Sequence, residues 1–287
     1  MNRKKKKRGQ WRDVWSRLQR NKVAMVSIVL LLVIILSAVF SELITPYVYT
    51  ERDLTNTFAF PSAAHLFGTD NLGRDIFSRV LVGGRISLLV AFGSVLLSAV
   101  VGSLLGAAAG YYGGKIEFGI MKLTDIMMAI PAFLLAVTVS AAMGTGLINT
   151  IVAVGLTNIH RFVRLMRAET LSVKGNEFIL ASRASGASDL YIILTHIFPN
   201  ALSSTIVNVT LGVGTAILQI SGLSFVGLGV RPPTPELGSM LASGRTYMRD
   251  FWPMVTFPGI AIVVTLILFN LSGDGLRDAM DPTMRGV

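Results

Sequence analysis

Long uncharged apolar segments recur along this chain, and they constrain its fold more than any other feature. Residues 23–40 and 86–112 contain no charged side chain and are 18 and 27 residues long. An α-helix rises about 1.5 Å per residue, so about 20 such residues cross a hydrocarbon core about 30 Å thick. Within lipid, a helix satisfies its backbone hydrogen bonds inside one segment. The sequence therefore predicts an all-α membrane protein.

The composition agrees with this interpretation. Hydrophobic residues make up 52% of the chain and charged residues only 15%, and the mean hydropathy is +0.62. Soluble domains carry about 25% charged residues, so this chain has too few to cover a globular surface in water. It has no cysteine, which excludes disulfides, thiolate metal sites and a cysteine nucleophile.

Turn residues and helix breakers divide the apolar sequence into about six predicted transmembrane helices. Pro46 ends the first, and Gly144-Thr145-Gly146 separates the third from the fourth. Pro131 predicts a kink within the third helix. The approximate bounds are 23–44, 86–112, 118–143, 147–167, 200–223 and 252–271.

The basic residues indicate which side of the membrane each segment faces. Six spans place both termini on one side, and 19 of the 26 Lys and Arg residues then lie on that side. The positive-inside rule therefore predicts cytoplasmic N and C termini. Ten of these residues precede Val23, where they fit a membrane flank that touches anionic headgroups better than a nucleic-acid site.

This topology predicts four regions. A basic cytoplasmic tail (1–22) precedes the first span and an extracytoplasmic segment (23–85). A membrane core (86–273) follows, and the chain ends in a cytoplasmic tail (274–287). The first span is expected to be retained, because its 18 uncharged residues exceed the roughly 7–15 of a signal-peptide core.

The cytoplasmic segment after the fourth span predicts two short helices. Asn176 is a candidate N-cap for a helix that ends near Ala184, and Gly186 predicts a turn. Ser188 is a candidate N-cap for the second helix, which Pro199 is expected to end before the fifth span. Small residues gather at this turn, so another protein could approach its backbone closely.

The run ASRASGAS through HIFP resembles the EAA loop of ABC importer permeases, whose pattern is E-A-A, three residues, Gly, nine residues and I-x-L-P. The spacing from Gly186 to Pro199 is kept, but Leu180 stands where the Glu would be and Ser182 replaces the second Ala. The resemblance implies an elbow that couples the chain to an ATPase. Its residues would be Ala181, Ser182, Arg183, Gly186, Ala187, Asp189 and Pro199.

Other stretches resemble the C-type permease subunits of dipeptide, oligopeptide and nickel importers. They are HLFGTDNLGRDIFSRVLVGGRISL (65–88), GYYGG, LSFVGLGVRPPTPELGSML (223–241) and GDGLRDAMDP (273–282). The resemblance implies the transmembrane domain of a type I ABC importer in a bacterial cytoplasmic membrane. It also implies a B-type permease partner, two ATPase subunits that bind ATP and Mg²⁺, and an extracytoplasmic substrate-binding protein. No cofactor is expected in this chain.

Three groups of residues are candidates for further roles. Gly102, Gly106 and Gly110 recur every four residues, which predicts a close helix contact, either beside a translocation path or as ordinary packing. Polar residues inside spans could line a hydrated path or make single interhelical hydrogen bonds; they are Asn208, Gln219, Ser221 and Asn270. Alternating charges over 65–80, expected on an outer-face helix, could dock the binding protein or brace the spans; they are Asp70, Arg74, Asp75 and Arg79.

The sequence has no candidate catalytic machinery. A phosphate loop G-x-x-x-x-G-K-[ST] is missing, because Ala109 and Ile116 replace its first Gly and its Ser/Thr around Gly114-Lys115. The three histidines have no acidic partner at metal-ligand spacing in sequence, so no metal site is expected. Two alternatives to a peptide importer remain: a nickel or metallophore importer, and an ATP-independent carrier or channel.

Overall fold

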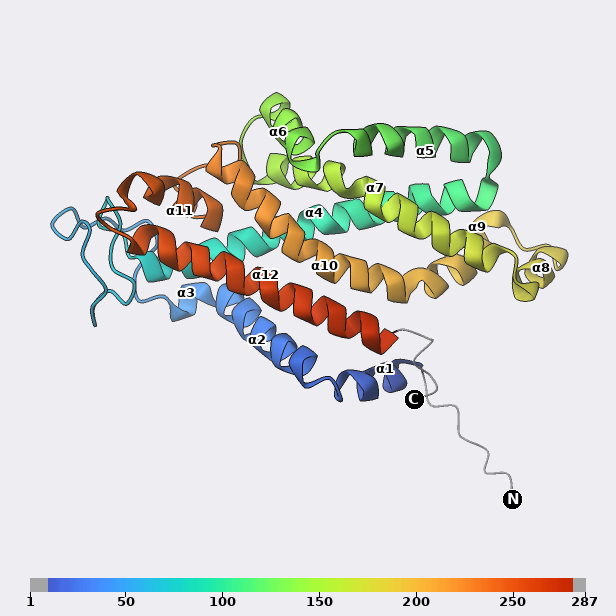
Figure 1. Cartoon of the computed structure of the whole chain (residues 1–287), viewed down its shortest axis with the longest axis horizontal. Coiled ribbons are helices and arrows are strands. Elements are labelled where there is room, and N and C mark those ends of the chain that lie inside the picture. Colours follow the sequence, from blue (N-terminus) through green and yellow to red (C-terminus); the bar gives the residue numbers. More distant parts are fainter. Residues whose placement is uncertain (1–9, 281–287) are drawn as a thin grey trace, which may run out of the picture.

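The computed structural model describes residues 10–280, and every regular element in this part of the chain is a helix. The long helices are α2 (Lys22–Val39), α4 (Ile76–Tyr112), α7 (Leu147–Lys174), α10 (Phe198–Phe225) and α12 (Pro253–Met280). Figure 1 shows α4, α7, α10 and α12 elongated in one common direction. The all-α prediction is therefore confirmed.

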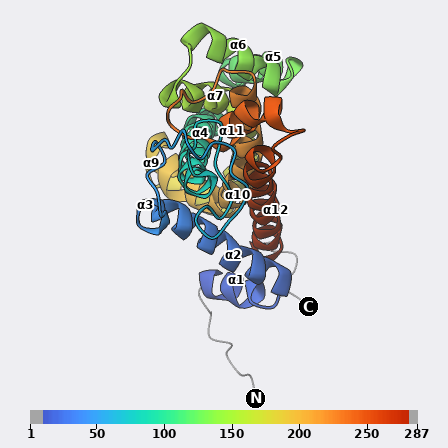
Figure 2. The same cartoon turned by 90° about the vertical axis from the view of Figure 1, so that its left-hand side faces the viewer.

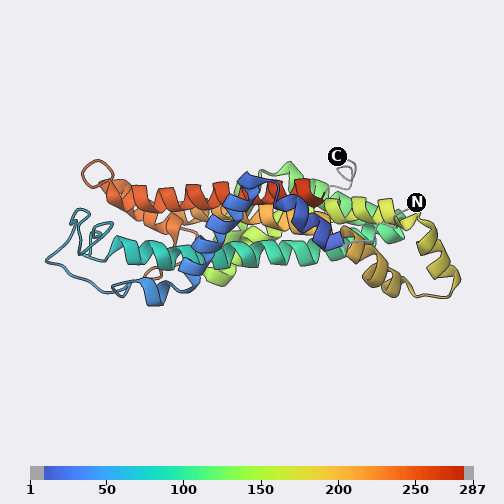
Figure 3. The same ribbon diagram turned by 90° about the horizontal axis from the view of Figure 1, so that it is seen from below.

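Shorter helices connect or flank these long ones. Figures 1 and 2 show α5 and α6 at one edge of the bundle and α1 at the opposite edge, and Figure 3 shows α2 running obliquely across the long helices. The short elements are α1 (Gln10–Leu18), α3 (Ser41–Ile44), α5 (Gly114–Ala129), α6 (Ala132–Met143), α8 (Glu177–Ala184), α9 (Asp189–Ile192), a π-helical turn η1 (Ile193–Ile197), α11 (Leu237–Gly244) and a 3₁₀ turn η2 (Arg245–Tyr247).

α4 begins ten residues before the predicted second span. Asp75 is its N-cap, and the carboxylate accepts a hydrogen bond of 2.7 Å from the Ser78 N–H. Its 37 residues reach about 55 Å at 1.5 Å per residue, more than the hydrocarbon core alone requires. The first turns of α4 therefore extend into the segment that is predicted to be extracytoplasmic.

The predicted third span is broken rather than kinked. α5 and α6 meet at an angle of 95°, with Ile130 and Pro131 in extended conformations between them. A proline lacks an N–H and disfavours helical geometry at the residue before it, which explains the position of the break.

The predicted fourth span, α7, is long enough to cross a membrane but is not uniformly apolar. Its second half carries Arg161, Arg164 and Arg167. Arg164 pairs with Asp125 of α5 at 2.7 Å, and Arg167 pairs with Glu117 of α5. By length and composition, four helical stretches of the described chain qualify as spans, or five with the bent pair, so the expected number of six is not reached by this criterion.

The ends of the helices sort according to the predicted side of the membrane. Helices α8 and α9 and the junction of α4 with α5 lie at the right-hand end of the molecule in Figure 1, and α1 and the last turn of α12 lie to the right of its middle. The irregular segment 45–75 and α11 lie at the left-hand end. Segments predicted to be cytoplasmic thus share the right-hand half.

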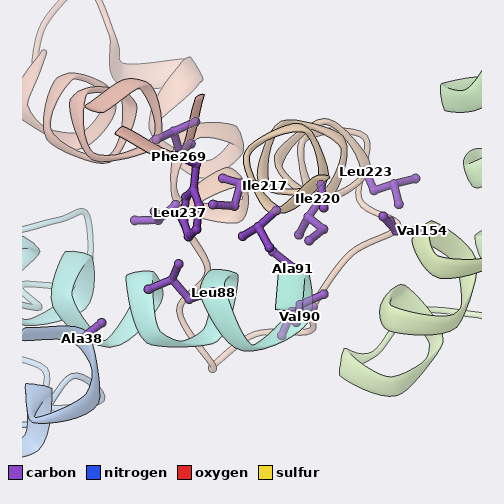
Figure 4. Close-up of a cluster of buried hydrophobic side chains, with 14 of the residues drawn as sticks. Ala38, Leu88, Val90, Ala91, Val154, Ile217, Ile220, Leu223, Leu237 and Phe269 are labelled. Carbon is purple, nitrogen blue, oxygen red and sulfur yellow. The ribbon is translucent and has the colours of Figure 1, made fainter. Parts of the chain in front are cut away.

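The largest buried apolar cluster lies where α4, α10 and α12 meet (Figure 4). Val90 of α4 and Ile220 of α10 are fully buried there, and Phe269 of α12 is 2% exposed. On the outside of the bundle, α2 exposes Val29 and Leu32 by about half. An apolar exterior suits a helix surrounded by lipid.

Candidate functional site

We call residues 176–199 the elbow. α8 begins after Asn176, and α9 begins after Ser188, whose hydroxyl accepts a hydrogen bond from the Tyr191 N–H at 3.3 Å. Gly186 turns the chain between them with φ +84°, a conformation that costs glycine little. The two predicted helices and the predicted turn are therefore present, although the Asn176 side chain makes no capping bond.

The prediction that Pro199 ends the second elbow helix is wrong. α9, η1 and α10 form one continuous helix from Asp189 to Phe225, and Pro199 lies in the first turn of α10. The Phe198 N–H bonds to the Ile193 carbonyl, five residues back, so the backbone is widened there. The π turn lies directly before Pro199, which has no N–H to donate to the helix.

The elbow presents an apolar surface away from the bundle. Ala181, Gly186 and their neighbours are exposed, as are several large apolar side chains: Phe178, Leu180, Leu190, Tyr191 and Leu194. An apolar surface of this kind outside the lipid is typical of a protein contact.

The opposite face of the elbow is packed against the ends of α4 and α7. Ile179 of α8 and Ile192 of α9 are 1% and 0% exposed. They belong to one buried cluster with Ala107 of α4 and Met166 of α7. The elbow is therefore seated on the long helices rather than suspended on a loose linker.

Tyr111 of α4 makes the polar contacts between the bundle and both elbow helices. Its hydroxyl donates to Asp189 Oδ1 at 2.6 Å and accepts from the Arg183 guanidinium at 2.8 Å. The hydrogen bond to Tyr111 raises the pKa of Arg183, which lies outside the membrane spans. The Lys174 ammonium donates to the Tyr111 carbonyl. Sequence reasoning had not singled out Tyr111, although it lies in the GYYGG stretch.

The structure places all three glycines of the four-residue stripe against α7. A Cβ on Gly102 would lie 2.6 Å from Phe162 Cβ, and one on Gly110 would lie 2.7 Å from Thr170 Cβ. A Cβ on Gly106 would overlap the Val163 carbonyl oxygen. The stripe therefore allows the backbones of α4 and α7 to approach closely.

The four polar residues predicted inside spans lie in different surroundings. Gln219 accepts a hydrogen bond of 2.8 Å from Asn158 of α7, which matches a single interhelical bond. Asn208 accepts one of 3.3 Å from Arg161 and lines a cavity of about 300 Å³ between α7, α10 and α12. Ser221 is 6% exposed, and Asn270 is half-buried. Gln219, Ser221 and Asn270 do not line that cavity.

The charged residues predicted on an outer-face helix lie mostly in an irregular segment, so that helix prediction is wrong before Ile76. Asp70 pairs with Arg74 at 2.7 Å and lies 3.6 Å from Arg79, while Asp75 caps α4 and contacts His65 Nδ1 at 3.0 Å. Asp70, Asp75 and Arg79 are less than 8% exposed. Of the two expected roles, this burial favours bracing, because the charges face one another rather than solvent.

A buried carboxylate that sequence reasoning missed holds α11 against α4. Glu236 is fully buried and accepts hydrogen bonds of 2.9 Å from the N–H groups of Gly238 and Ser239. Ser87 of α4 donates to the same carboxylate at 3.0 Å. The ELGS run could have revealed it, because Glu before a short apolar helix with Ser at the third position can form a reciprocal cap.

The described residues contain no group of three or more His, Asp or Glu side chains placed to hold an ion. The elbow is the candidate functional site because it has an exposed apolar face and is packed against the long helices on its other face. It offers a contact surface.

Residues 102–286 match the family model described as binding-protein-dependent transport system inner membrane component. Residues 9–61 match the N-terminal transmembrane domain of oligopeptide transport permease C. Dipeptide transport system permease protein DppC of Alkalihalophilus pseudofirmus is 43% identical over 275 residues, covering 96% of this chain and 90% of that protein. Glutathione transport system permease protein GsiD of Escherichia coli is 44% identical over 282 residues, covering 96% and 91%.

The fold is also similar to that of solved ABC transporters. The inward-facing MetNI methionine transporter gives a TM-score of 0.55 at 22% identity, covering 70% of this chain and 96% of that chain. An amino acid ABC transporter gives 0.53 at 12% identity, covering 70% and 94%. This multi-span protein of the bacterial inner membrane therefore belongs to the binding-protein-dependent transport components, as a permease subunit of an ABC importer of the peptide and glutathione family with a type I transmembrane domain.

Proposed function

We propose that this chain forms half of the translocation pore of an importer for short peptides. A B-type permease would supply the other half, and an extracytoplasmic binding protein would deliver the substrate. Two ATPase subunits, which would bind the ATP and Mg²⁺, would drive transport. Support for the substrate class comes from the dipeptide and glutathione permeases, since glutathione is itself a tripeptide.

The observation that carries the ATPase contact is the two-sided character of the elbow. One face buries Ile179 and Ile192 against α4 and α7, and the other exposes apolar side chains such as Leu180 and Leu190. The elbow also lies in the same half of the molecule as α1 and the last turn of α12 (Figure 1). A cytoplasmic ATPase that grips the exposed face would push on the long helices through the packed face.

Transport would follow an alternating-access cycle. ATP binding to the partner subunits would favour one arrangement of the two permeases, and hydrolysis with product release would restore the other. The elbow can shift this equilibrium only by the difference in the free energy of its contacts between the two states. The elbow must therefore be packed rigidly against the long helices, so that movement of the ATPases also moves the helices of the pore.

Purification and uptake test this proposal. We expect the two ATPases and the B-type permease to co-purify with the full chain, and liposomes containing the complete complex to accumulate a labelled dipeptide only when ATP and the binding protein are present. Uptake by this chain alone, without ATPases, would instead establish a carrier or channel.

The substrate is tested by competition in the same liposomes. We expect unlabelled dipeptides or glutathione to reduce uptake of the labelled dipeptide, and chelated nickel to leave it unchanged. Competition by chelated nickel alone would overturn the peptide assignment in favour of a metallophore importer.

A further inference from the structure

Tyr111 joins three helices at one atom. It lies in the last turn of α4, its side chain is 3% exposed, and its hydroxyl bonds to Arg183 and Asp189 at the same time. Arg183 is in the last turn of α8, and Asp189 is the first residue of α9. The facing ends of both elbow helices are therefore held by a single oxygen.

The turn between these helices does not itself hold α9 against α8. The N–H groups of Gly186 and Ala187 bond to carbonyls of α8, so they end that helix without reaching α9. Gly186 has no atom within 4 Å of an added Cβ, which leaves open space around the turn. The angle between α8 and α9 therefore depends on contacts outside the turn.

The apolar contacts beneath the elbow fix its position less sharply than hydrogen bonds do. Burial of Ile179 and Ile192 favours contact with the bundle, but hydrophobic attraction has no preferred direction. Hydrogen bonds weaken steeply when their geometry is distorted, and those to charged groups are the stronger ones. A change in the angle between α8 and α9 would lengthen at least one of the two bonds to Tyr111.

Without Tyr111, Arg183 and Asp189 would contribute little to holding α8 and α9 together. Both residues are exposed, and no direct ion pair joins them in the described part of the chain. Exposed ion pairs contribute little in water. The Tyr111 hydroxyl, placed at a buried position, gives each charged group a fixed partner and connects it to α4.

We propose that Tyr111 is a positioning residue for coupling: its hydroxyl locks α8 and α9 at one angle on the end of α4. Because the glycine stripe packs α4 closely on α7, movement of the elbow then displaces both long helices as one body. The inference rests on the proposed function, since it assumes that an ATPase moves the elbow.

The test replaces Tyr111 by Phe in the complete importer, which removes the hydroxyl and keeps the ring. We expect the ATPases to co-purify and hydrolyse ATP as in the wild type, while substrate uptake per ATP falls by about three- to tenfold, because a lost bond to charged groups weakens the link between the two states. Tyr112→Phe is the matched control, since Tyr112 is the next residue and half exposed, and it should behave as wild type. Wild-type uptake per ATP in Y111F would overturn the proposal.

A second variant separates loss of coupling from general damage. Asp189→Ala removes the acceptor of the same hydrogen bond, so we expect a similar loss of uptake per ATP, and Y111F combined with D189A should be no worse than either alone. Losses that add up would show that the two residues act independently and would overturn the proposal. If Y111F does not assemble, the single D189A variant must still show the loss of uptake per ATP.

Distance measurements give a readout that transport does not. The chain has no native cysteine, so spin labels can be placed at S185C in the elbow turn and at L96C on an exposed part of α4. We expect one narrow distance distribution in the wild-type complex and a broader one in Y111F. An unchanged distribution would overturn the proposal, whereas failure of the wild-type chain to bind ATPases would refute the proposed function instead.

Discussion

At the scale of single residues, the effect of a substitution depends on two things: how closely another backbone approaches the site, and whether a buried polar group loses its hydrogen-bond partner. Gly106 and Gly84 are both in α4, but only Gly106 faces another backbone; an added Cβ at Gly84 meets nothing within 4 Å. Glu236 illustrates the polar case, because its buried carboxylate satisfies donors from two helices. The consequences of substitution follow from these surroundings rather than from residue type.

Replacing Gly106 by Ala is expected to destabilise the folded chain by about 1–3 kcal/mol, because the methyl group forces α4 away from α7. Thermal unfolding in detergent measures this change. Gly84→Ala is the matched control and should leave stability unchanged or slightly raised, as alanine favours helices. Equal stability of both variants would contradict the close contact.

Replacing Glu236 by Ala is expected to cost about 1–2 kcal/mol through the lost helix cap alone. The Ser87 hydroxyl also loses its acceptor, and hydrogen exchange should rise over 237–244. Glu236→Gln retains an acceptor oxygen and should lie between E236A and the wild type. If exchange in α11 stays at the wild-type level in E236A, the capping role is wrong.

At the scale of elements, the elbow combines a flexible turn residue with two helices that are fixed from outside. Gly186 has a positive φ, whereas Gly175, just before the elbow, has φ −82° and open space around it. The same substitution therefore has different consequences on the two sides of α8.

Gly186→Val is expected to uncouple uptake from ATP hydrolysis while leaving membrane insertion intact, because a β-branched residue is strained at φ +84°. ATP hydrolysis and substrate uptake, measured on the same liposomes, give the ratio. Gly175→Val is the matched control and should keep the wild-type ratio, because Gly175 has φ −82° and open space around it. Wild-type uptake in G186V would refute the role assigned to this turn.

At the scale of the whole molecule, the arrangement predicts sidedness. The elbow lies at one end and the segment 45–75 at the other (Figure 1), so they should face opposite sides of the membrane. We expect a membrane-impermeant maleimide added to intact cells to label T57C, an exposed position in that segment, but not S185C. Both should react in opened cells. Labelling of S185C from outside would reverse the topology and remove the ATPase contact.

Local chemistry explains what could be predicted from the sequence. The long apolar segments predicted helices in lipid. Asn176, Gly186 and Ser188 predicted where the elbow helices begin and where the chain turns, because helix caps and turns depend on neighbouring residues in the chain. The spacing of Gly102, Gly106 and Gly110 indicated a close helix contact for the same reason. These features need no knowledge of distant partners.

Other features depended on contacts between distant parts of the chain. Pro199 looked like a helix end, yet a π turn carries the helix through it, and Asp70 and Arg79 looked exposed, yet they are buried against each other. Tyr111 and Glu236 gained their roles from partners 78 and 149 residues away. The sequence by itself determined that the chain is helical, that its long apolar helices lie in a membrane and where the elbow turns. Only the tertiary structure decided where some helices break or continue, which charges are buried and which atoms join the elbow to the bundle, because burial and long-range hydrogen bonds exist only once the helices have packed.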